Sequence, residues 1–208
     1  MAHVLYVMGS PRGAGGSSTR LAAAFLESYR AANPGDTIDT LDVWAEELPP
    51  FAAEAADGKL KGMAGMALPA NEQAAFDLVL TYIARLKKAD KVVLSTGMWN
   101  FSVPYRVKHW VDLVVQAGHT FGFDPARGYF GLVTGKPVQL VLATGGDYSE
   151  DPMAQADMLT SYLKAVFGFM GFTDIRTVCA SCTAYPPDVS GPAMERALVA
   201  AKAAGTSF

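Results

Sequence analysis

The sequence predicts a single α/β domain over residues 1–208, in which five strands form a parallel sheet that helices cover on both faces. Runs typical of strands alternate with segments typical of helices along the chain, which favours a parallel sheet with helical crossovers. The strand-like runs are almost wholly apolar, as expected for strands buried on both faces. Charged residues make up 18% of the chain, where about 25% is usual, so much surface must be covered.

The predicted strands are short apolar runs, most of them rich in β-branched residues. The run from His3 to Met8 stands almost at the start of the sequence, and the partly polar run from Thr37 to Val43 is expected nearer an edge. In order along the chain, the five predicted strands cover residues 3–8, 37–43, 91–96, 137–143 and 174–179.

The predicted helices carry apolar residues at helical spacing. Residues 71–88 give the clearest pattern, with Val79, Ile83 and Leu86 on one stripe. Another helix is expected to begin near Pro104, because proline suits a first helical turn. The remaining helices are predicted from the glycine-rich segment 9–19 to Asn33, over 156–170 and over 192–204.

Two segments have no steady period. Residues 44–69 contain Pro49-Pro50 among scattered glycines and alanines, and we expect a long functional loop with one helical turn at most. Residues 121–135 are aromatic and glycine-rich, and we expect them to be irregular. No repeat or low-complexity linker divides the chain, so one domain is predicted.

Composition narrows the possible functions. A formal net charge of -3 argues against nucleic-acid binding, which requires basic surface. The longest uncharged stretch, residues 92–105, is interrupted by Asn100 and Pro104 and is shorter than the roughly 20 residues of a membrane span. The start of the sequence lacks a secretory signal pattern, and two cysteines suit a reducing compartment, so a cytoplasmic location is expected.

Three unusual loops follow predicted strands: residues 9–19, 97–104 and 144–150. In a parallel sheet the carboxyl ends of the strands lie at one edge, and ligands bind in the crevice beyond it. We therefore expect these loops to form the ligand site.

The first loop is typical of a phosphate site. Ser10, Ser17 and Ser18 stand near the predicted N-terminus of the first helix, where free N–H groups and the helix dipole favour an anion, and Arg12 could add charge. Ordinary helix capping is the alternative, but three hydroxyls beside glycines favour phosphate.

The type of phosphate can be narrowed further. The Walker pattern is absent, because Lys59 and Lys136 are followed by Leu60 and Pro137. A dinucleotide fingerprint could begin at Gly13 with Asp42 on a ribose, but its third glycine would fall at Ser18. A serine-rich loop instead suits a terminal phosphate monoester, which points to FMN.

The other two loops suit a flat ring. Met98, Trp99, Asn100 and Phe101 place apolar side chains around one amide, although each aromatic could equally belong to a core cluster. The run Thr144-Gly-Gly146 lets backbone N–H groups approach the polar edge of a flavin, although a plain turn is the alternative.

Several motifs together resemble the FMN-dependent NADH-azoreductase family, which is similar to the NAD(P)H:quinone reductases. The motifs are Ser10-Pro-Arg-Gly, Ser18 with Leu21, Met98-Trp-Asn-Phe-Ser-Val-Pro, Lys108-His-Trp-Val-Asp112, Ala117-Gly-His-Thr-Phe121 and Gly131-Leu-Val-Thr-Gly-Lys136. The resemblance implies a flavodoxin-like three-layer α/β/α fold with strand order 2-1-3-4-5. It also implies a homodimer with tightly but non-covalently bound FMN at its interface, NADH or NADPH as co-substrate, and reduction of quinones and azo compounds.

The resemblance also implies roles for particular residues. Cofactor binding would fall to Ser10, Gly16, Ser17, Ser18, Met98, Trp99, Asn100, Phe101, Ala143, Thr144, Gly145 and Gly146. Phe121 would wall the substrate pocket. The sequence departs from the family pattern at Gly16, where a serine is usual, at Gly97, at Trp99 and at Ala143-Thr144, which bears on substrate and nucleotide preference.

Other candidate residues carry weaker signals. Cys179 and Cys182 follow a strand rather than opening a helix, and no second cysteine pair completes a zinc site, so no metal is expected. His109 is interpreted as a surface or interface residue, whereas His119 is near enough to the proposed pocket to touch substrate. No serine nucleophile elbow occurs.

The predicted mechanism is alternating hydride transfer, from nicotinamide to FMN and then to a flat acceptor, with no side chain required as acid or base. A flavodoxin-type electron carrier that acts with a protein partner is the alternative, although such carriers use strong acidic fields and the net charge is -3. A nicotinamide-binding module without flavin is a third possibility.

Overall fold

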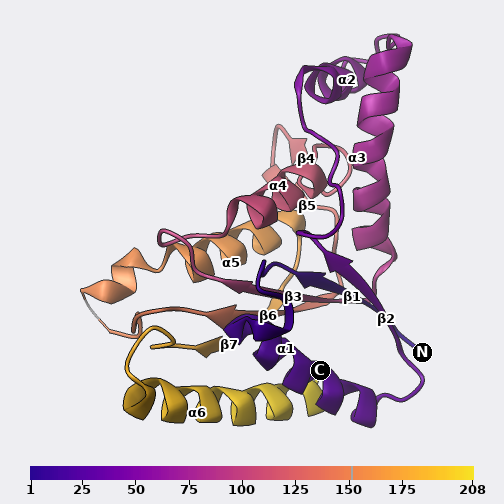
Figure 1. Cartoon of the computed structure of the whole chain (residues 1–208). Helices are drawn as coiled ribbons and strands as arrows, with labels where there is room; N and C mark the ends of the chain where they lie inside the picture. Colours follow the sequence, from indigo (N-terminus) through magenta and orange to yellow (C-terminus); the bar gives the residue numbers. More distant parts are fainter. Residues whose placement is uncertain (151) are drawn as a thin grey trace.

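Three layers make up the protein, with a five-stranded parallel sheet between two layers of helices (Figure 1). The computed structural model describes residues 1–150 and 152–208. The sheet strands are β1 (His3–Met8), β2 (Thr37–Asp42), β3 (Lys91–Gly97), β6 (Pro137–Ala143) and β7 (Asp174–Ala180). The flavodoxin-like α/β architecture that the sequence predicts is therefore present.

The strands lie in the order β2-β1-β3-β6-β7. This differs from the predicted order 2-1-3-4-5, which assumed that the chain has five strands. Two further strands lie between β3 and β6 in the sequence, so the last two strands of the sheet are β6 and β7. The two further strands are β4 (Phe121–Asp124) and β5 (Gly128–Gly131), which pair antiparallel as a separate hairpin. The prediction that residues 121–135 are irregular was wrong, because residues 121–131 form this hairpin. Gly128, which follows the turn, has a positive φ of 77°, a conformation that glycine adopts without strain.

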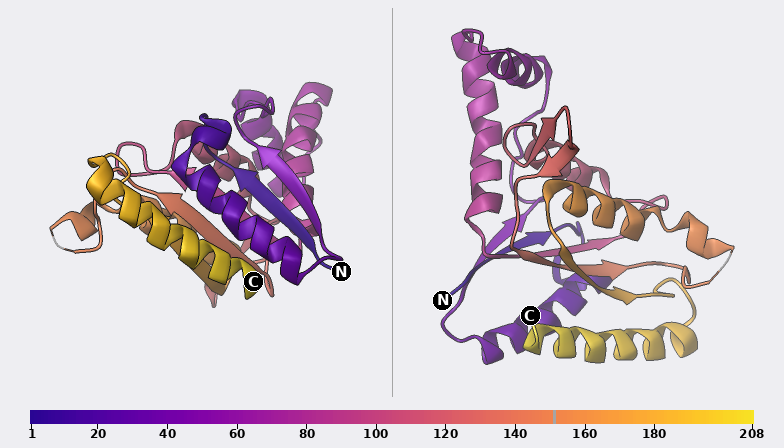
Figure 2. Two further views of the ribbon diagram at one scale, coloured as in Figure 1. Left: turned by 60° about the horizontal axis from the view of Figure 1, so that its bottom comes forward. Right: turned by 180° about the vertical axis from the view of Figure 1, so that it is seen from behind.

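The helices divide between the two faces of the sheet. They are α1 (Ser17–Ala32), α2 (Ala53–Met63), α3 (Ala70–Lys88), α4 (Tyr105–Val114), α5 (Met158–Met170) and α6 (Pro187–Thr206). Helices α1 and α6 cover one face, and α3, α4 and α5 cover the other, as Figure 2 shows from two further directions. Short 3-10 turns, Gly13–Gly15 and Met153–Ala156, precede α1 and α5.

Each face of the sheet has its own core. On the first face, Leu21 and Phe25 of α1 pack with Val4 and Val93 of the sheet. On the second face, the predicted stripe of α3 is buried against the sheet together with Trp110 of α4 and Phe167 of α5. This two-sided burial explains part of the low content of charged residues.

Residues 44–69 differ most from the prediction. They contain α2, which packs on α3 and projects beyond the sheet together with the N-terminal half of that helix (Figure 1). The prediction of a long loop with one helical turn at most was wrong. The helix was missed because α2 buries two small residues, Ala55 and Gly58, and so has no apolar stripe. A Cβ atom at position 58 would lie 2.7 Å from the backbone oxygen of Glu72, so the two helices approach closely at a glycine.

Helix α6 also begins earlier than expected. It starts at Pro187, and Pro192, the predicted start, lies inside the helix. Pro187 is at the first helical position, where its missing N–H group has no intrahelical acceptor to lose. Within the described ranges, none of the helices combines the length and the apolar character that crossing a bilayer requires.

Candidate functional site

The three loops that follow β1, β3 and β6 lie side by side at the carboxyl edge of the sheet. Backbone hydrogen bonds continue the strand ladder into them: Gly9 N donates to Ser95 O at 2.7 Å, Met98 N to Ala143 O at 2.8 Å, and Thr144 N to Ala180 O at 2.9 Å. Between the loops is a pocket of about 260 Å³, here named the loop-edge pocket. It is lined by Gly9, Ser10, Pro11, Arg12, Gly16, Ser17, Ser18, Gly97, Met98, Trp99, Ala143, Gly145 and Thr183.

The N-terminus of α1 offers hydrogen-bond donors to this pocket. Its N-cap residue is Gly16, so no side chain caps the helix. The N–H groups of the first helical residues have no intrahelical acceptor, whereas Arg20 N donates to Gly16 O at 2.9 Å. The Thr19 Oγ1 atom is buried and has no hydrogen-bond partner among the residues that the structure describes. The helix end therefore has unused donors and the positive end of its dipole beside the pocket.

The serine side chains complete this donor set. Ser10 and Ser18 are buried, with 8% and 2% of their surface exposed. Ser10 Oγ accepts a weak hydrogen bond from Arg12 N at 3.4 Å, and its hydroxyl hydrogen remains available to a ligand. Neutral donors around one free helix end fit a phosphate monoester, with the exposed Arg12 adding positive charge. The residues present thus fit the phosphate of FMN.

The loop after β3 contains a strained two-residue turn. Trp99 N donates to Ser102 O at 2.8 Å and Ser102 N to Trp99 O at 3.0 Å. Between them, Asn100 and Phe101 both have positive φ, 47° and 70°, which defines a type I′-like turn. A phenylalanine in this region is uncommon and strained. Strain of this kind clusters at ligand-binding sites, and the turn borders the loop-edge pocket.

The turn divides the four residues predicted for this loop. Met98 and Trp99 line the pocket, whereas Asn100 and Phe101 are exposed at the tip of the turn and are not among its lining residues. Phe101 is 48% exposed, with its ring edge-on to Tyr148 at 6.5 Å between centroids. Both tip side chains are thus free to contact a ring seated above the pocket.

Trp99 also belongs to an aromatic cluster. Trp44, which follows β2, lies 5.6 Å from Trp99 and 5.1 Å from Tyr105, measured between ring centroids. The Nε1 atom of Trp44 is buried, and no hydrogen-bond partner for it is found in residues 1–150 and 152–208. Trp44 and Tyr105 thus pack against Trp99, which lines the loop-edge pocket. The sequence did not predict that the segment after β2 contacts this residue.

The third loop is held by its own backbone contacts. The Thr144 hydroxyl donates to Gly146 O at 2.9 Å, so it is engaged within the loop. Thr183 N and Thr183 Oγ1 both donate to Thr144 O, at 3.0 and 2.9 Å. Of the predicted residues, Ala143 and Gly145 line the pocket, whereas Thr144 and Gly146 are not among its lining residues.

Thr183 is a pocket residue that was missed from the sequence. It follows β7, which is the fifth strand of the sheet, and so it reaches the same edge as the other loops. Applying the same edge rule to the last strand would have found it.

Phe121 and His119 lie away from the loop-edge pocket. The ring of Phe121 lies tilted against that of Phe169, at 4.5 Å between centroids, and lines a pocket of about 660 Å³ between α2 and the β4–β5 hairpin. His119 lines a neighbouring pocket, with its ring 5.9 Å from that of Phe76. Burial lowers the pKa of His119, and the nearby Lys87 lowers it further. Within this one chain, neither side chain is brought to the predicted cofactor residues.

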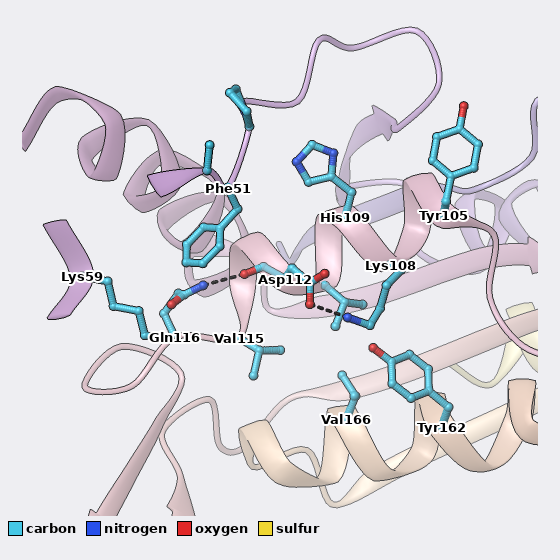
Figure 3. A pocket seen from close by; sticks show the side chains of 13 residues that line it. Phe51, Lys59, Tyr105, Lys108, His109, Asp112, Val115, Gln116, Tyr162 and Val166 are labelled. Carbon is cyan, nitrogen blue, oxygen red and sulfur yellow. Dashed lines mark hydrogen bonds and ion pairs between the residues drawn. The ribbon is translucent and has the colours of Figure 1, made fainter. Parts of the chain in front are cut away.

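A pocket of about 700 Å³ lies between α4, α5 and residues 50–52 (Figure 3). It is here named the α4–α5 pocket. Its lining residues are Pro50, Phe51, Ala52, Lys59, Tyr105, Lys108, His109, Val111, Asp112, Val115, Gln116, Tyr162 and Val166. His109, interpreted from the sequence as a surface or interface residue, is half-buried here and donates from Nε2 to Pro49 O at 2.8 Å.

Both cysteines are free thiols near the end of β7. Cys179 is half-buried, and burial raises the pKa of its thiol. Cys182 is buried and has a positive φ of 58°, and its N–H group donates to Gly146 O at 3.1 Å. A raised thiol pKa opposes reactivity, which agrees with a structural role for Cys179.

Comparison with known proteins places the chain in a family. A family described as having a flavodoxin-like fold matches residues 2–204. The FMN-dependent NADH:quinone oxidoreductase of Nitratidesulfovibrio vulgaris strain DP4 is 41% identical over 184 residues, which cover 88% of each chain. FMN-dependent NADH:quinone oxidoreductase 1 of Bacillus licheniformis is 39% identical and covers 100% of both chains.

Solved structures agree with this relationship. The azoreductase from Bacillus anthracis strain Sterne superposes with a TM-score of 0.93 at 33% identity, over 100% of both chains. A structure described as an FMN-dependent NADH-azoreductase of Bacillus anthracis strain Ames Ancestor in complex with FMN superposes with a TM-score of 0.89 at 24% identity, which shows the shared fold. The chain belongs to the flavodoxin-like family that contains the FMN-dependent NADH:quinone oxidoreductases.

Proposed function

We propose that this protein is an FMN-dependent NADH oxidoreductase that reduces quinones and azo compounds. The observation that carries the proposal is the N-terminus of α1, where no side-chain cap is found among the described residues and where buried Ser10 and Ser18 line a pocket suited to a phosphate. The names of the relatives, which include NADH:quinone oxidoreductases and an azoreductase, support the reaction.

The proposed roles follow the three loops. Ser10, Gly16, Ser17 and Ser18 hold the phosphate, and the segments 98–101 and 143–146 border the ring system. FMN, when bound, supplies the hydride chemistry. The chain supplies binding, orientation and exclusion of water, and no side chain is assigned as acid or base. Trp99 and Phe101 are 42% and 48% exposed, so they can flank both a nicotinamide and a flat acceptor at the open side of the ring.

We also propose that two copies of the chain form a homodimer. A hairpin patch of exposed apolar side chains supports this: Phe123, Tyr129, Phe130, Leu132 and Phe169, with between 37% and 65% of each exposed. Phe123 and Phe169 both contact Tyr129, and exposed apolar surface of this kind usually marks an interface. Such an interface would bring Phe121, which packs on Phe169, near the second subunit. A cytoplasmic location is proposed as well, because both cysteines are free.

The first experiment identifies the chromophore of the purified protein and then follows NADH oxidation with a simple quinone and no partner protein. Bound FMN and steady turnover are expected. A protein that carries FMN but turns over only with a protein partner would instead be a flavodoxin-type electron carrier. A colourless protein that does not take up added FMN would contradict the proposal.

The second experiment measures the mass in solution by sedimentation. The wild type is expected to be a dimer, and the double variant Tyr129→Glu, Phe130→Glu is expected to be a monomer, because two charges would be buried without partners. Val199→Glu is the matched control, because Val199 is 70% exposed on α6 at the other face of the sheet. Equal masses for wild type and double variant would remove the hairpin patch from the interface.

A further inference from the structure

Helices α1 and α6 lie side by side on one face of the sheet (Figure 2), and a groove of about 300 Å³ runs between their N-terminal parts. This volume is at the lower end of the range of small-molecule sites. The groove is here named the α1–α6 groove. Its walls include Ser17 and Arg20 of α1, and Gly191, Met194, Glu195 and Leu198 of α6. Of these residues, Ser17 alone has a role in the proposed function.

The α1–α6 groove is continuous with the loop-edge pocket at the proposed phosphate site. Ser17 and Thr183 line both of them. Ser17 is the first residue of α1, where the N–H groups and the helix dipole favour an anion. A substituent that leaves the phosphate on the Ser17 side would therefore enter the groove directly.

Two opposite charges line the groove without pairing. Arg20 follows Ser17 by three residues, so the two side chains are neighbours on the surface of α1. Glu195 stands on the opposite wall, and both Arg20 and Glu195 are exposed. Among the residues that the structure describes, neither of them lies within ion-pair distance of an opposite charge. The groove thus offers a free cation about one helical turn from the phosphate site, and a free acceptor across from it.

The rest of the α6 wall suits a flat ring. Met194 and Leu198 are four residues apart and so lie on the same face of the helix, where both are half-buried against the core under the sheet. A methionine thioether is adaptable and makes favourable contacts with aromatic rings. Gly191 precedes them on the helix, and a Cβ atom there would meet nothing within 4 Å. The wall is therefore open beside an apolar surface.

We propose that the α1–α6 groove holds the adenosine monophosphate half of FAD, so that the protein binds FAD as well as FMN. This inference rests on the proposed function, because the flavin and the first phosphate occupy the loop-edge pocket. Arg20 pairs with the second phosphate through charge-assisted hydrogen bonds. Glu195 accepts hydrogen bonds from the ribose hydroxyls, and the adenine ring lies on Met194 and Leu198.

The first test compares FAD with FMN by isothermal titration calorimetry of the full-length apoprotein. FAD is expected to bind at one site per chain and to be displaced by FMN. An apoprotein that binds FMN but not FAD would overturn this inference and leave the proposed function intact. An apoprotein that binds neither flavin would contradict the proposed function.

A variant at Arg20 tests the second phosphate. Arg20→Met should weaken binding of FAD by about 10-fold and leave binding of FMN unchanged, because FMN has no second phosphate. Arg30→Met, at an exposed position near the other end of α1, is the matched control and should bind both flavins as the wild type does. Equal losses of FMN and FAD in Arg20→Met would assign this side chain to the first phosphate and overturn the pairing proposed for it.

A second variant fills the groove. Gly191→Trp has room for its Cβ atom and places a large ring where the adenosine would lie. It should weaken FAD by about 10-fold or more and leave FMN unchanged. Ala200→Trp is the matched control, because this exposed position is nine residues further along α6 and so on the opposite side of the helix. Unchanged affinity for FAD in Gly191→Trp would show that the adenosine lies outside the α1–α6 groove and would overturn the inference.

Discussion

Gly16 lies so close to Ser10 that a Cβ atom at position 16 would sit 2.5 Å from the Ser10 Oγ. Since Gly16 is the N-cap residue of α1, the hydroxyl of Ser10 occupies the space where a capping side chain would begin. The free helix end and the serine hydroxyl are therefore presented to the pocket together. A side chain at this position would require the Ser10 hydroxyl to move from where it lies in this structure.

Replacing Gly16 should disturb this arrangement. Gly16→Ala is expected to turn the Ser10 hydroxyl out of place and to weaken FMN binding by about 10-fold, the value of one hydrogen bond to a charged group. Fluorescence titration of apoprotein with FMN measures the effect. Gly15→Ala is the matched control, because a Cβ atom there would meet nothing within 4 Å. Equal losses in both variants would show that the loop, rather than the Ser10 contact, determines affinity.

Ser18 is the most buried serine of the proposed phosphate site, at 2% exposed. Ser18→Ala should weaken FMN binding by about 10- to 100-fold, because a hydrogen bond to a charged phosphate contributes about 1.5–3 kcal/mol. The same titration measures it. Ser28→Ala, ten residues further along α1 and so about 15 Å away, should leave the affinity unchanged. An unaltered dissociation constant in Ser18→Ala would exclude this hydroxyl from the site.

The strained turn at Asn100 and Phe101 should show in stability. At the φ of 70° found for Phe101, glycine is tolerated but alanine costs about 1 kcal/mol. Phe101→Gly is therefore expected to unfold with a free energy about 1 kcal/mol higher than Phe101→Ala, in urea denaturation of the apoprotein. At Ala23, exposed within α1, glycine should instead be about 1 kcal/mol less stable than alanine. The same order at both positions would argue against the left-handed conformation at Phe101.

An ion-pair network should make stability depend on pH. Arg85 donates from Nε and Nη2 to Asp39 at 2.7 and 2.8 Å and pairs with Glu46 at 3.1 Å. The hydrogen bond from Arg85 holds the pKa of Asp39 below its ordinary value. Because the native pKa is the lower one, this contribution is complete above the unfolded pKa near 4 and is lost as pH falls through the native pKa.

Asp39→Asn should accordingly lower the free energy of unfolding at pH 7 by about 1 kcal/mol or less, since both side chains keep contact with solvent. The difference from wild type should shrink as pH falls from about 5 toward 3, measured by urea denaturation across that range. Glu27→Gln, at an exposed position on α1, is the control without such a network. A difference that stays constant with pH would contradict the assignment to the Asp39 carboxylate.

The sheet and its covering helices could be predicted because their signals are local. Buried parallel strands are continuous apolar runs, and α3 shows a clear stripe. Helix α2 shows none, because Gly58 packs directly on the backbone of Glu72 and the ion pair of Lys61 with Glu72, at 2.5 Å, replaces apolar contact. Contacts of this kind join residues of two helices and leave no period in either one.

The candidate site was predictable to the extent that it follows from sheet topology. The loops after β1, β3 and β6 meet because parallel strands end at one edge, and the same rule would have found Thr183. Trp44 and the α4–α5 pocket depend on how the segment after β2 lies against α4, where Arg106 donates to Val43 O and His109 to Pro49 O, and no periodicity encodes that path. Closeness in sequence can also mislead. His119 follows α4, which begins beside the site, but it lines a different pocket.

The pairing of α1 with α6 has a consequence for biosynthesis. The backbones of these helices nearly touch, because a Cβ atom at Gly205 would lie 2.2 Å from the carbonyl oxygen of Phe25. Helix α1, at whose N-terminus we propose the phosphate site, leaves the ribosome early, but its apolar side is covered by a helix that is made about 155 residues later. At usual elongation rates, the apolar side of α1 stays uncovered for on the order of 10 s before α6 is made. The nascent chain is therefore expected to need chaperone protection over that interval, and the cofactor to bind after the sixth helix has docked.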